Sequence, residues 1–535
     1  MDGHRAALSR AAGRAALIAV PELFLGLFFL FPLASIVDAG LRPEGRLAAG
    51  TVTEVLGDAD LRGVIWFTLW QAAASTALTL AVGLPAAYAL SRLEFRGRRL
   101  LQALVLVPFV LPTVVVGTAF ASPGRSLAAL LAAHVFFNVA VVVRVVGGSW
   151  AHVDPELEDA AEGLGARGLA RFTAVLLPLA RPAVVGAATL VFLFTFASFG
   201  VVLLLGGPGR ATIEVEIYRQ TSQLLDLPVA AVLALLQLTV VGVLLWAGAV
   251  AESRAVRQRL LASEAVARPP RTQGERIFVA CALGGLCALA LLPPARLVWR
   301  SLSGPDGLTL SRYLELGSVR EGSVLAVSPL GAVSNSLMFA ASAAAVALLV
   351  GLPASLALSR AWRSGWLRVL VGLPLGVSAV TIGFGFVVAF DRAPLDLRGS
   401  ALLVPLAQAV VAIPFVVRIV APVLASIETE LIESAQSLGA SPAQAFRDVT
   451  VPLASQAVLG AAVFAFVVSL GEFGATAFLA RVDRPTMPLA IVRLLGQPGA
   501  AAVGQATAMS VLLMVVTASV AFAFDRFRVG SFGRF

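Results

Sequence analysis

Twelve long apolar runs dominate this sequence of 535 residues. A helix that crosses a lipid bilayer needs about 20 predominantly apolar residues in succession, and each run reaches that length. Only 13% of the residues are charged, whereas soluble domains carry about 25%. The pattern predicts an all-α polytopic membrane protein embedded in the lipid bilayer, with about twelve transmembrane helices. The expected spans lie near residues 15–37, 64–91, 100–121, 126–150, 182–206 and 228–251, and near 276–300, 333–360, 368–391, 399–425, 455–480 and 502–527.

Clusters of arginine predict the orientation of these spans. The sequence contains no lysine, so all 40 basic residues are arginine. Basic clusters favour the cytoplasmic side of a membrane, and with twelve spans all clusters fall on one side. We therefore expect a multi-pass protein of the cell membrane with both termini in the cytoplasm. The clusters are Arg5, Arg10 and Arg14; Arg92, Arg96, Arg98 and Arg99; Arg254, Arg257, Arg259, Arg268, Arg271 and Arg276; Arg360, Arg363 and Arg368; and Arg526, Arg528 and Arg534.

The residue types exclude several kinds of chemistry. A phosphate-binding Walker A loop requires a lysine, and lysine Schiff-base chemistry is excluded for the same reason. Cys281 and Cys287 lie six residues apart in an apolar run, which fits neither a redox pair nor a zinc site. The three histidines are too scattered to form a metal centre by themselves. We expect a transport subunit and not an enzyme, with no bound cofactor or metal and no nucleic-acid partner.

The chain reads as a duplication. The segment 83–86 (Gly-Leu-Pro-Ala) returns 268 residues later at 351–354, and the pair 143–144 (Val-Arg) returns 274 residues later at 417–418. Six spans followed by six spans in the same orientation predict two parallel repeats related by an axis along the membrane normal. The predicted organisation is a first half at 1–251, a cytoplasmic linker at 252–275 and a second half at 276–535.

A regular loop follows the fourth span of each half. In each copy an acidic residue and two small residues are followed by a glycine and, thirteen residues after it, a proline. The pattern predicts a short helix, a turn in which glycine adopts a positive φ, a second short helix, and a proline that opens the next span. The alternative is an amphipathic surface loop without a further role. The residues are Asp159, Ala160, Ala161, Gly165 and Pro178 in the first copy, and Glu433, Ser434, Ala435, Gly439 and Pro452 in the second.

This loop resembles the signature E-A-A-x3-G-x9-I-x-L-P of permease subunits of ATP-binding-cassette importers. Both copies match at the acid, glycine and proline, with Asp159 for Glu and Ser434 for Ala as mild departures. The resemblance implies the type I importer permease fold, with each loop seated on one of two ATPase subunits in the cytoplasm. ATP and Mg would be used by those partner subunits, and an extracytoplasmic binding protein would deliver the solute. A proton- or sodium-driven secondary transporter is the alternative from another class.

Several stretches of the first half look like the permease of thiamine importers. They lie at 133–138, 196–199, 205–207, 211–218 and 230–237. The resemblance implies thiamine as the transported solute. The segment 471–476 (Gly-Glu-Phe-Gly-Ala-Thr) of the second half suits ferric-iron permeases equally well, so ferric iron remains the alternative substrate.

One carboxylate inside a predicted span marks a candidate substrate path. An ionisable side chain in a span is costly and is a functional candidate by default, and Glu472 is such a residue. Thiamine is a cation, which a carboxylate and neighbouring aromatic rings attract by charge and cation–π contact. The alternative for Glu472 is a structural carboxylate bonded to a hydroxyl or to backbone groups. The candidate path consists of Glu472, Phe473, Ser198, Phe199 and Asn138.

Overall fold

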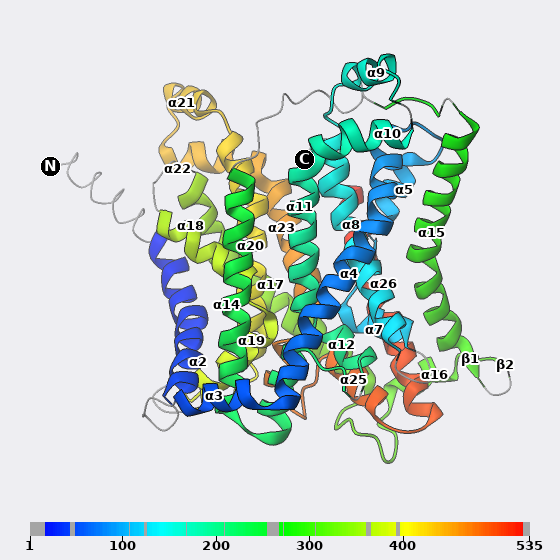
Figure 1. Ribbon diagram of the computed structural model, residues 1–535. Coiled ribbons are helices and arrows are strands. Elements are labelled where there is room, and N and C mark those ends of the chain that lie inside the picture. Colours follow the sequence, from blue (N-terminus) through cyan, green and yellow to red (C-terminus); the bar gives the residue numbers. More distant parts are fainter. Residues whose placement is uncertain are drawn as a thin grey trace. The chain divides into compact units, whose positions relative to one another are not determined.

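The fold is built almost entirely from helices. The computed structural model describes residues 17–42, 49–105, 107–121, 126–166, 168–207, 209–253, 267–270, 272–304, 307–359, 365–391 and 396–527 (Figure 1). Most of the predicted linker 252–275 and both predicted cytoplasmic termini lie outside these residues. Two short strands, β1 (Ser303–Gly304) and β2 (Gly307–Leu308), pair after the seventh predicted span.

Ten helices among the described residues are long and apolar enough to cross a membrane. They overlap ten of the twelve predicted spans, which confirms the polytopic all-α architecture. The ten helices are Leu17–Leu41, Ala59–Arg92, Leu127–Trp150, Phe172–Phe196, Leu227–Gly248, Gln273–Leu302, Pro329–Ser359, Leu403–Ser426, Pro442–Gly471 and Ala500–Phe522.

The third predicted span of each half is a broken helix, which corrects the expectation of twelve simple spans. The region 100–121 contains three short helices, the last of which begins after Pro112. In 368–391, two helical segments meet at an angle of 104°. Ser378 caps the second of them, because its hydroxyl accepts a hydrogen bond from the Thr381 N–H at 3.0 Å. Proline lacks an N–H and a capping serine starts a new helix, so both sequences interrupt the backbone hydrogen-bond ladder.

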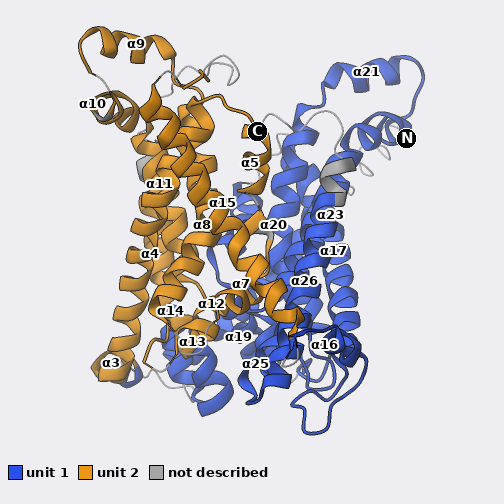
Figure 2. Ribbon diagram, turned by 90° about the vertical axis from the view of Figure 1, so that its right-hand side faces the viewer, with its two compact units in different colours: residues 1–51, 217–235, 304–535 blue, residues 52–216, 236–303 orange. Residues whose placement is uncertain are grey.

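One compact unit contains residues 52–216 and 236–303 and is drawn in orange in Figure 2. Its long helices α4, α8 and α11 pack on one another, and α15 packs on α4 and α7. The Tyr88 ring of α4 lies 5.9 Å from the Phe278 ring of α15. Its helices are α4 (Ala59–Arg92), α5 (Arg98–Leu104), α6 (Val107–Val110), α7 (Thr113–Phe120), α8 (Leu127–Trp150), α9 (Pro155–Gly163), α10 (Leu169–Arg171), η3 (Phe172–Leu176), α11 (Leu177–Phe196), α12 (Gly200–Leu205) and α15 (Gln273–Leu302).

The other compact unit contains residues 1–51, 217–235 and 304–535 and is drawn in blue. Its helices α17, α20 and α23 pack on one another, and α2 packs on α19. The Phe390 ring lies 5.8 Å from Phe28 and 6.0 Å from Phe31. Its helices are η1 (Gly26–Leu30), α2 (Phe31–Leu41), α16 (Ser311–Leu314), η6 (Glu315–Gly317), α17 (Pro329–Ser359), α18 (Gly365–Gly372), η7 (Leu373–Gly376), α19 (Ala379–Ala389), α20 (Leu403–Ser426), α21 (Thr429–Ser437), α22 (Pro442–Ala445), η8 (Phe446–Thr450), α23 (Val451–Gly471), α24 (Thr476–Leu479), α25 (Met487–Gly496) and α26 (Ala500–Phe527).

The compact units do not follow the two halves of the sequence. Helix α2, the first helix of the first half, belongs to the unit that holds most of the second half, and α15, the first helix of the second half, belongs to the other unit. Helices α3 (Ala49–Gly57), α13 (Ile213–Arg219) and α14 (Leu227–Ser253), with the π-helical turn η4 (Gln220–Leu224), have residues in or between both units. The boundaries 1–251 and 276–535 therefore describe the predicted repeat in the sequence, whereas packing exchanges the first helices.

The same close helix crossing occurs once in each unit. A Cβ placed on Gly83 of α4 would lie 2.7 Å from the side chain of Val142 of α8, and one on Gly351 of α17 would lie 2.7 Å from Val416 of α20. Small residues let helices in a membrane approach closely, and their packing then stabilises the pair. These glycines explain why the segments 83–86 and 351–354 are repeated in the sequence.

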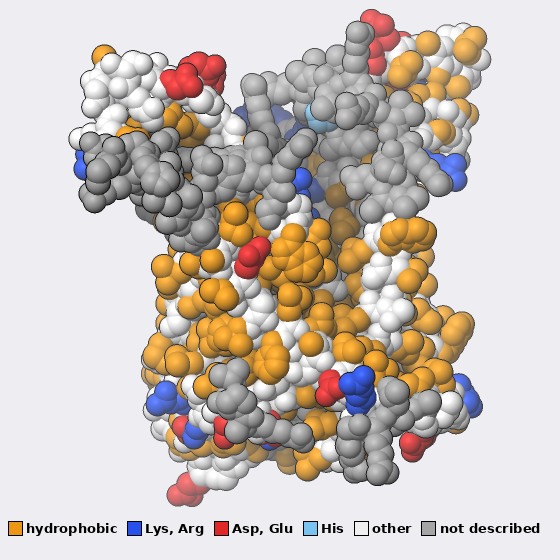
Figure 3. Space-filling view, turned by 90° about the vertical axis from the view of Figure 1, so that its left-hand side faces the viewer, with side chains coloured by type: hydrophobic (Ala, Val, Ile, Leu, Met, Phe, Trp, Pro, Cys, Tyr) orange, Lys and Arg blue, Asp and Glu red, His pale blue; other side chains and the backbone are white. Residues whose placement is uncertain are grey.

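The exposed surface suits lipid. Large apolar side chains are exposed along the long helices, among them Leu23, Trp246, Leu292, Leu349 and Phe522. On the face shown in Figure 3, hydrophobic side chains cover the middle of the helices, and most of the charged side chains that are drawn lie near the helix ends. A surface of this kind is unfavourable in water and favourable in a bilayer. The chain is a multi-pass membrane protein.

We expect the substitution Gly83→Ala to destabilise the protein. Adding a methyl group to a well-packed contact costs about 1–3 kcal/mol, and the measurement is the apparent melting temperature in detergent micelles. The double variant Gly83→Ala/Val142→Ala should recover stability, because the second change makes room for the added methyl group. The control is Gly186→Ala in α11, where a Cβ would meet nothing within 4 Å. Equal melting temperatures for Gly83→Ala and Gly186→Ala would contradict the close crossing.

Candidate functional site

The two repeated loops fold in the same way. In the first, α9 ends at Gly163, and Gly165 has a φ of +87°; in the second, α21 ends at Ser437, and Gly439 has a φ of +95°. An L residue with a side chain is strained at such a φ, whereas glycine is not. The glycine predicted from the motif is therefore required by the backbone in both copies.

Each turn is a Schellman cap, which explains the spacing between the small residues and the glycine. The Ala166 N–H donates to the Ala161 carbonyl at 2.9 Å, and the Gly165 N–H donates to the Glu162 carbonyl at 3.0 Å. The second loop repeats both bonds, from Ala440 to Ala435 at 3.1 Å and from Gly439 to Gln436 at 2.9 Å. This pair of bonds satisfies the last carbonyls of a helix when the chain turns through a left-handed residue.

A π-helical turn precedes each motif proline. Segments η3 and η8 lead directly into α11 and α23, where Pro178 and Pro452 occupy the first turn. Proline is tolerated there because the N–H groups of a first turn have no partner within the helix. Each loop is thereby continuous with a long membrane helix, so that a displacement of the loop is passed to that helix.

Two leucines in each loop are exposed at matching positions. Leu157 and Leu431 are 48% and 47% exposed, and Leu164 and Leu438 are both 90% exposed. The exposed residues Ala160 and Ser434 lie between them. Positions i, i+3 and i+7 share one face of a helix, so each loop presents an apolar ridge. The motif carboxylates of Asp159 and Glu433 are exposed beside these ridges. Sequence reasoning missed the leucines, although their identity at a spacing of 274 residues was a visible signal.

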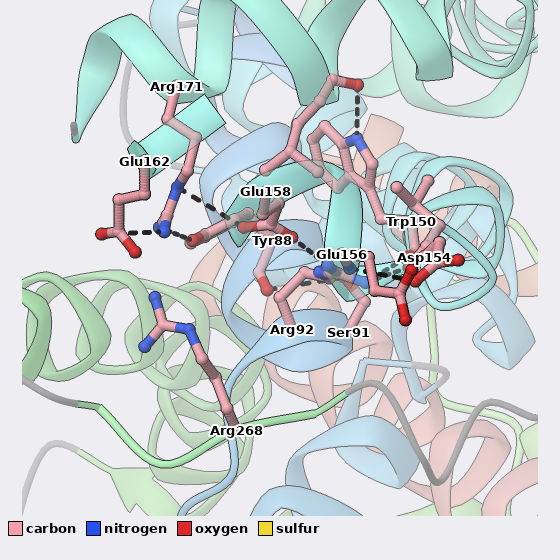
Figure 4. A network of polar contacts seen from close by, with 12 residues as sticks. Tyr88, Ser91, Arg92, Trp150, Asp154, Glu156, Glu158, Glu162, Arg171 and Arg268 are labelled. Carbon is pink, nitrogen blue, oxygen red and sulfur yellow. Dashed lines mark hydrogen bonds and ion pairs between the residues drawn. The ribbon is translucent and has the colours of Figure 1, made fainter. Parts of the chain in front are cut away.

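Buried ion pairs hold the first loop to the helices beneath it (Figure 4). Glu158 of α9 is 5% exposed and pairs with Arg92 at the end of α4. Its second carboxylate oxygen lies 3.4 Å from Nε of Arg171. Arg92 also donates to the carbonyls of Trp150 and Val153, at 3.1 and 2.7 Å. Sequence reasoning had counted Glu158 among the acidic residues of the loop and Arg92 among the orientation signals, so it missed this contact between distant segments.

The polar residues of the candidate path have partners within their own unit. One carboxylate oxygen of Glu472 accepts a hydrogen bond from the Ala475 N–H at 2.7 Å, and the other accepts from the Thr476 hydroxyl at 2.6 Å and its N–H at 3.1 Å. Glu472 therefore caps the start of α24 and is 8% exposed. Its neighbour Phe473 is buried. These contacts match the structural alternative for Glu472, and its role in a path stays a prediction.

Ser198, Phe199 and Asn138 lie in the other unit, close to His134. The two ring nitrogens of His134 lie 2.9 Å from the hydroxyls of Ser75 and Ser198, and the Asn138 amide donates to the His134 carbonyl at 2.9 Å. All of these side chains are buried, as is Phe199. Hydrogen bonds of this kind join helices inside a membrane. The structure brings Ser198, Asn138 and His134 together within one polar group, and a role in solute passage stays a prediction for them as well.

Comparison with known families agrees with the two repeats and their loops. The model of the family described as "Binding-protein-dependent transport system inner membrane component" matches the chain twice, at residues 79–255 and 344–529. Both matches contain one complete loop. The chain belongs to this family and is a tandem permease component of an ATP-binding-cassette importer, with two copies of the family domain in one polypeptide.

Individual relatives extend this result to most of the chain. A probable ABC transporter permease of Sinorhizobium fredii, named y4fN, is 26% identical over 87% of this chain and 88% of its own length. The thiamine transport system permease protein ThiP of Escherichia coli is 27% identical over 82% of this chain and 84% of its own. A putative 2-aminoethylphosphonate transport system permease of Salmonella typhimurium is 30% identical over 42% of this chain and 84% of its own.

Removal of the Glu472 side chain should lower stability. The variant Glu472→Ala leaves three donors in a buried region without their acceptor, and each unsatisfied group costs about 1–3 kcal/mol. Glu472→Gln retains an acceptor oxygen and should lose less. The free energy of unfolding, measured by denaturant titration in mixed micelles, checks both. The matched control is the exposed Glu433→Ala. If all three variants are as stable as the original protein, the cap at α24 contributes nothing.

Proposed function

We propose that this permease carries thiamine, delivered by an extracytoplasmic binding protein, and that two ATPase subunits drive it through the loops around Gly165 and Gly439. The observation that carries the coupling role is the repetition of one loop geometry with the same exposed leucines. An exposed apolar ridge on a short helix suits a hydrophobic groove in a partner protein. The neighbouring carboxylates of Asp159 and Glu433 suit basic side chains at the rim of such a groove.

The connection of each loop to a membrane helix suggests how the force travels. When the ATPase subunits close on ATP, a displaced loop would move α11 or α23, which begins directly after it. Helices α11 and α23 pack on α4 and α8, and on α17 and α20, respectively. Rigid packing would convert the displacement into a shift between outward and inward access. ATP and Mg are used by the partner subunits in this scheme, with the loops and both termini on the cytoplasmic side of the cell membrane.

Thiamine is the substrate that two lines of support share. Segments between 133 and 237 resemble thiamine permeases, and the ThiP proteins of Escherichia coli and Brucella abortus are 27% identical to this chain over 82% of its length. Ferric iron is the alternative, on the segment 471–476. An ion-driven secondary transporter is the alternative mechanism, and it requires no ATPase partner.

We expect Leu438→Asp and Leu164→Asp each to uncouple the importer. A carboxylate on the apolar ridge would be buried without a partner when the loop docks, which costs about 1–3 kcal/mol or more. The measurements are co-purification of the ATPase subunit and ATP-driven uptake in proteoliposomes. Leu438→Met is the control, because it preserves the apolar volume. Normal co-purification and uptake for both aspartate variants would remove the coupling role from the loops.

Uptake of labelled solute tests the substrate. The chain is expressed with the ATPase and binding-protein genes adjacent to its own gene in a host that lacks thiamine transport. We expect saturable thiamine uptake that requires ATP and disappears in the Gly439→Val variant, because Val is strained at the positive φ of the turn. A complex that assembles and hydrolyses ATP, but takes up ferric iron and no thiamine, would contradict the proposed substrate. Uptake driven by an ion gradient without ATP would contradict the importer mechanism.

A further inference from the structure

A cluster of charged side chains joins the first loop to three other segments of its unit. Arg171 of α10 lies 3.5 Å from Glu162 of α9, in addition to its contact with Glu158. Its Nη2 lies 3.9 Å from Glu275, at the start of α15. The cluster contains three arginines and three glutamates, so its charges balance. The members are Arg92, Glu158, Glu162, Arg171, Arg268 and Glu275.

The cluster reaches the segment between the two halves of the sequence through Arg268. The Arg268 guanidinium donates to both oxygens of Glu275, at 2.6 and 3.1 Å, and the hydrogen bonds to this carboxylate raise the pKa of Arg268. The Arg268 backbone pairs with the end of α4, because its N–H donates to the Arg92 carbonyl at 3.1 Å and its carbonyl accepts from the Glu94 N–H at 2.8 Å. The first loop, α4, α15 and this linker segment are thus tied to one another.

The second loop has uncharged residues where the cluster stands in the first. At a spacing of 274 residues, Glu158, Glu162 and Arg171 correspond to Ile432, Gln436 and Ala445. Within the part of the chain that the structure describes, no ion pair includes a residue of α21. The counterpart of Arg92 is Arg360, which lies outside the described residues. The two loops therefore share one backbone geometry and one apolar ridge but are attached to their helices by different interactions.

Buried, hydrogen-bonded ion pairs hold a more restrictive geometry than apolar contacts do. A charge that loses its partner in a buried site is strongly unfavourable, so Glu158 has little freedom to leave Arg92 and Arg171. Ile432 and Ala445 can shift against apolar neighbours without exposing an unpaired charge. The first loop should accordingly move as one body with α4 and α15, and the second should retain local freedom.

We infer that Arg92, Glu158 and Arg171 are positioning residues that make the first loop the rigid element of ATP coupling, while the second loop adapts to its ATPase subunit. The inference depends on the proposed coupling role of the loops and adds to it a functional inequality of the two. Arg268 and Glu275 extend the rigid body to the linker between the repeats. Substitutions in the cluster then change the efficiency of coupling without touching the apolar ridge.

The test is a variant that gives the first loop the residues of the second, Glu158→Ile/Arg171→Ala. The complete complex with its ATPase subunits and binding protein is reconstituted in proteoliposomes, and solute transport is measured per ATP hydrolysed. We expect both ATPase subunits to remain bound, because Leu157, Leu164 and Gly165 are unchanged. The ratio of transport to hydrolysis should fall about fivefold or more, the lower end of typical coupling between sites. Glu158→Asp, which preserves the charge, should recover most of the ratio.

Hydrogen exchange in the same complex provides a readout that does not depend on transport. In the original protein the amides of α9 should exchange more slowly than those of α21, and in the double variant the two loops should exchange alike. An unchanged transport ratio, or equal exchange of α9 and α21 in the original protein, would overturn the inference. The Leu438→Asp and Leu164→Asp variants separate the two proposals. If they too leave coupling intact, the proposed function fails; if they abolish it while the double variant behaves normally, only the inequality of the loops fails.

Discussion

A bilayer offers no hydrogen bonds to an exposed backbone, and every other feature of this protein is arranged within that constraint. Peptide groups in lipid must be satisfied within their own helix, which is why ten apolar segments form helices long enough to span. Departures from the helix occur where the protein itself supplies partners. The bend at Ser378 is capped by its hydroxyl, and the break at Glu472 is capped by its carboxylate. Such interruptions are tolerated in a membrane where they are buried in protein.

Duplication has preserved the backbone of the loops more strictly than their attachments. Gly165 and Gly439 both adopt a positive φ, and the two helices before them end with the same pair of hydrogen bonds. A backbone of this kind is demanded by geometry, so the residues that permit it recur. The side chains beneath the loops obey no such demand. Glu158 is buried among arginines, whereas its counterpart Ile432 is uncharged, and both arrangements satisfy a buried position at a helix end.

The sequence predicted the parts of the fold that depend on local patterns. Ten of the twelve spans were found because an apolar run of about 20 residues has few alternatives to a membrane helix. The two breaks, near Pro112 and Ser378, were missed because an apolar run gives no sign of whether a proline or serine inside it will end a helix. The motif residues Asp159, Gly165, Glu433 and Gly439 were found by their spacing. The exposed leucines beside them were missed because exposure depends on what packs against a residue.

Local chemistry and internal repetition were thus determined by the sequence itself: a lysine-free membrane chain, two parallel copies, and one glycine-turned loop in each. The tertiary structure decided which distant segments meet. Only packing placed α2 against α19 and α15 against α4, and only packing brought Glu158 to Arg92, 66 residues away in the chain. The physical reason is that hydrogen-bond spacing, hydrophobic runs and glycine torsions act between neighbours in the sequence, whereas burial and charge pairing act between whatever segments the fold brings together.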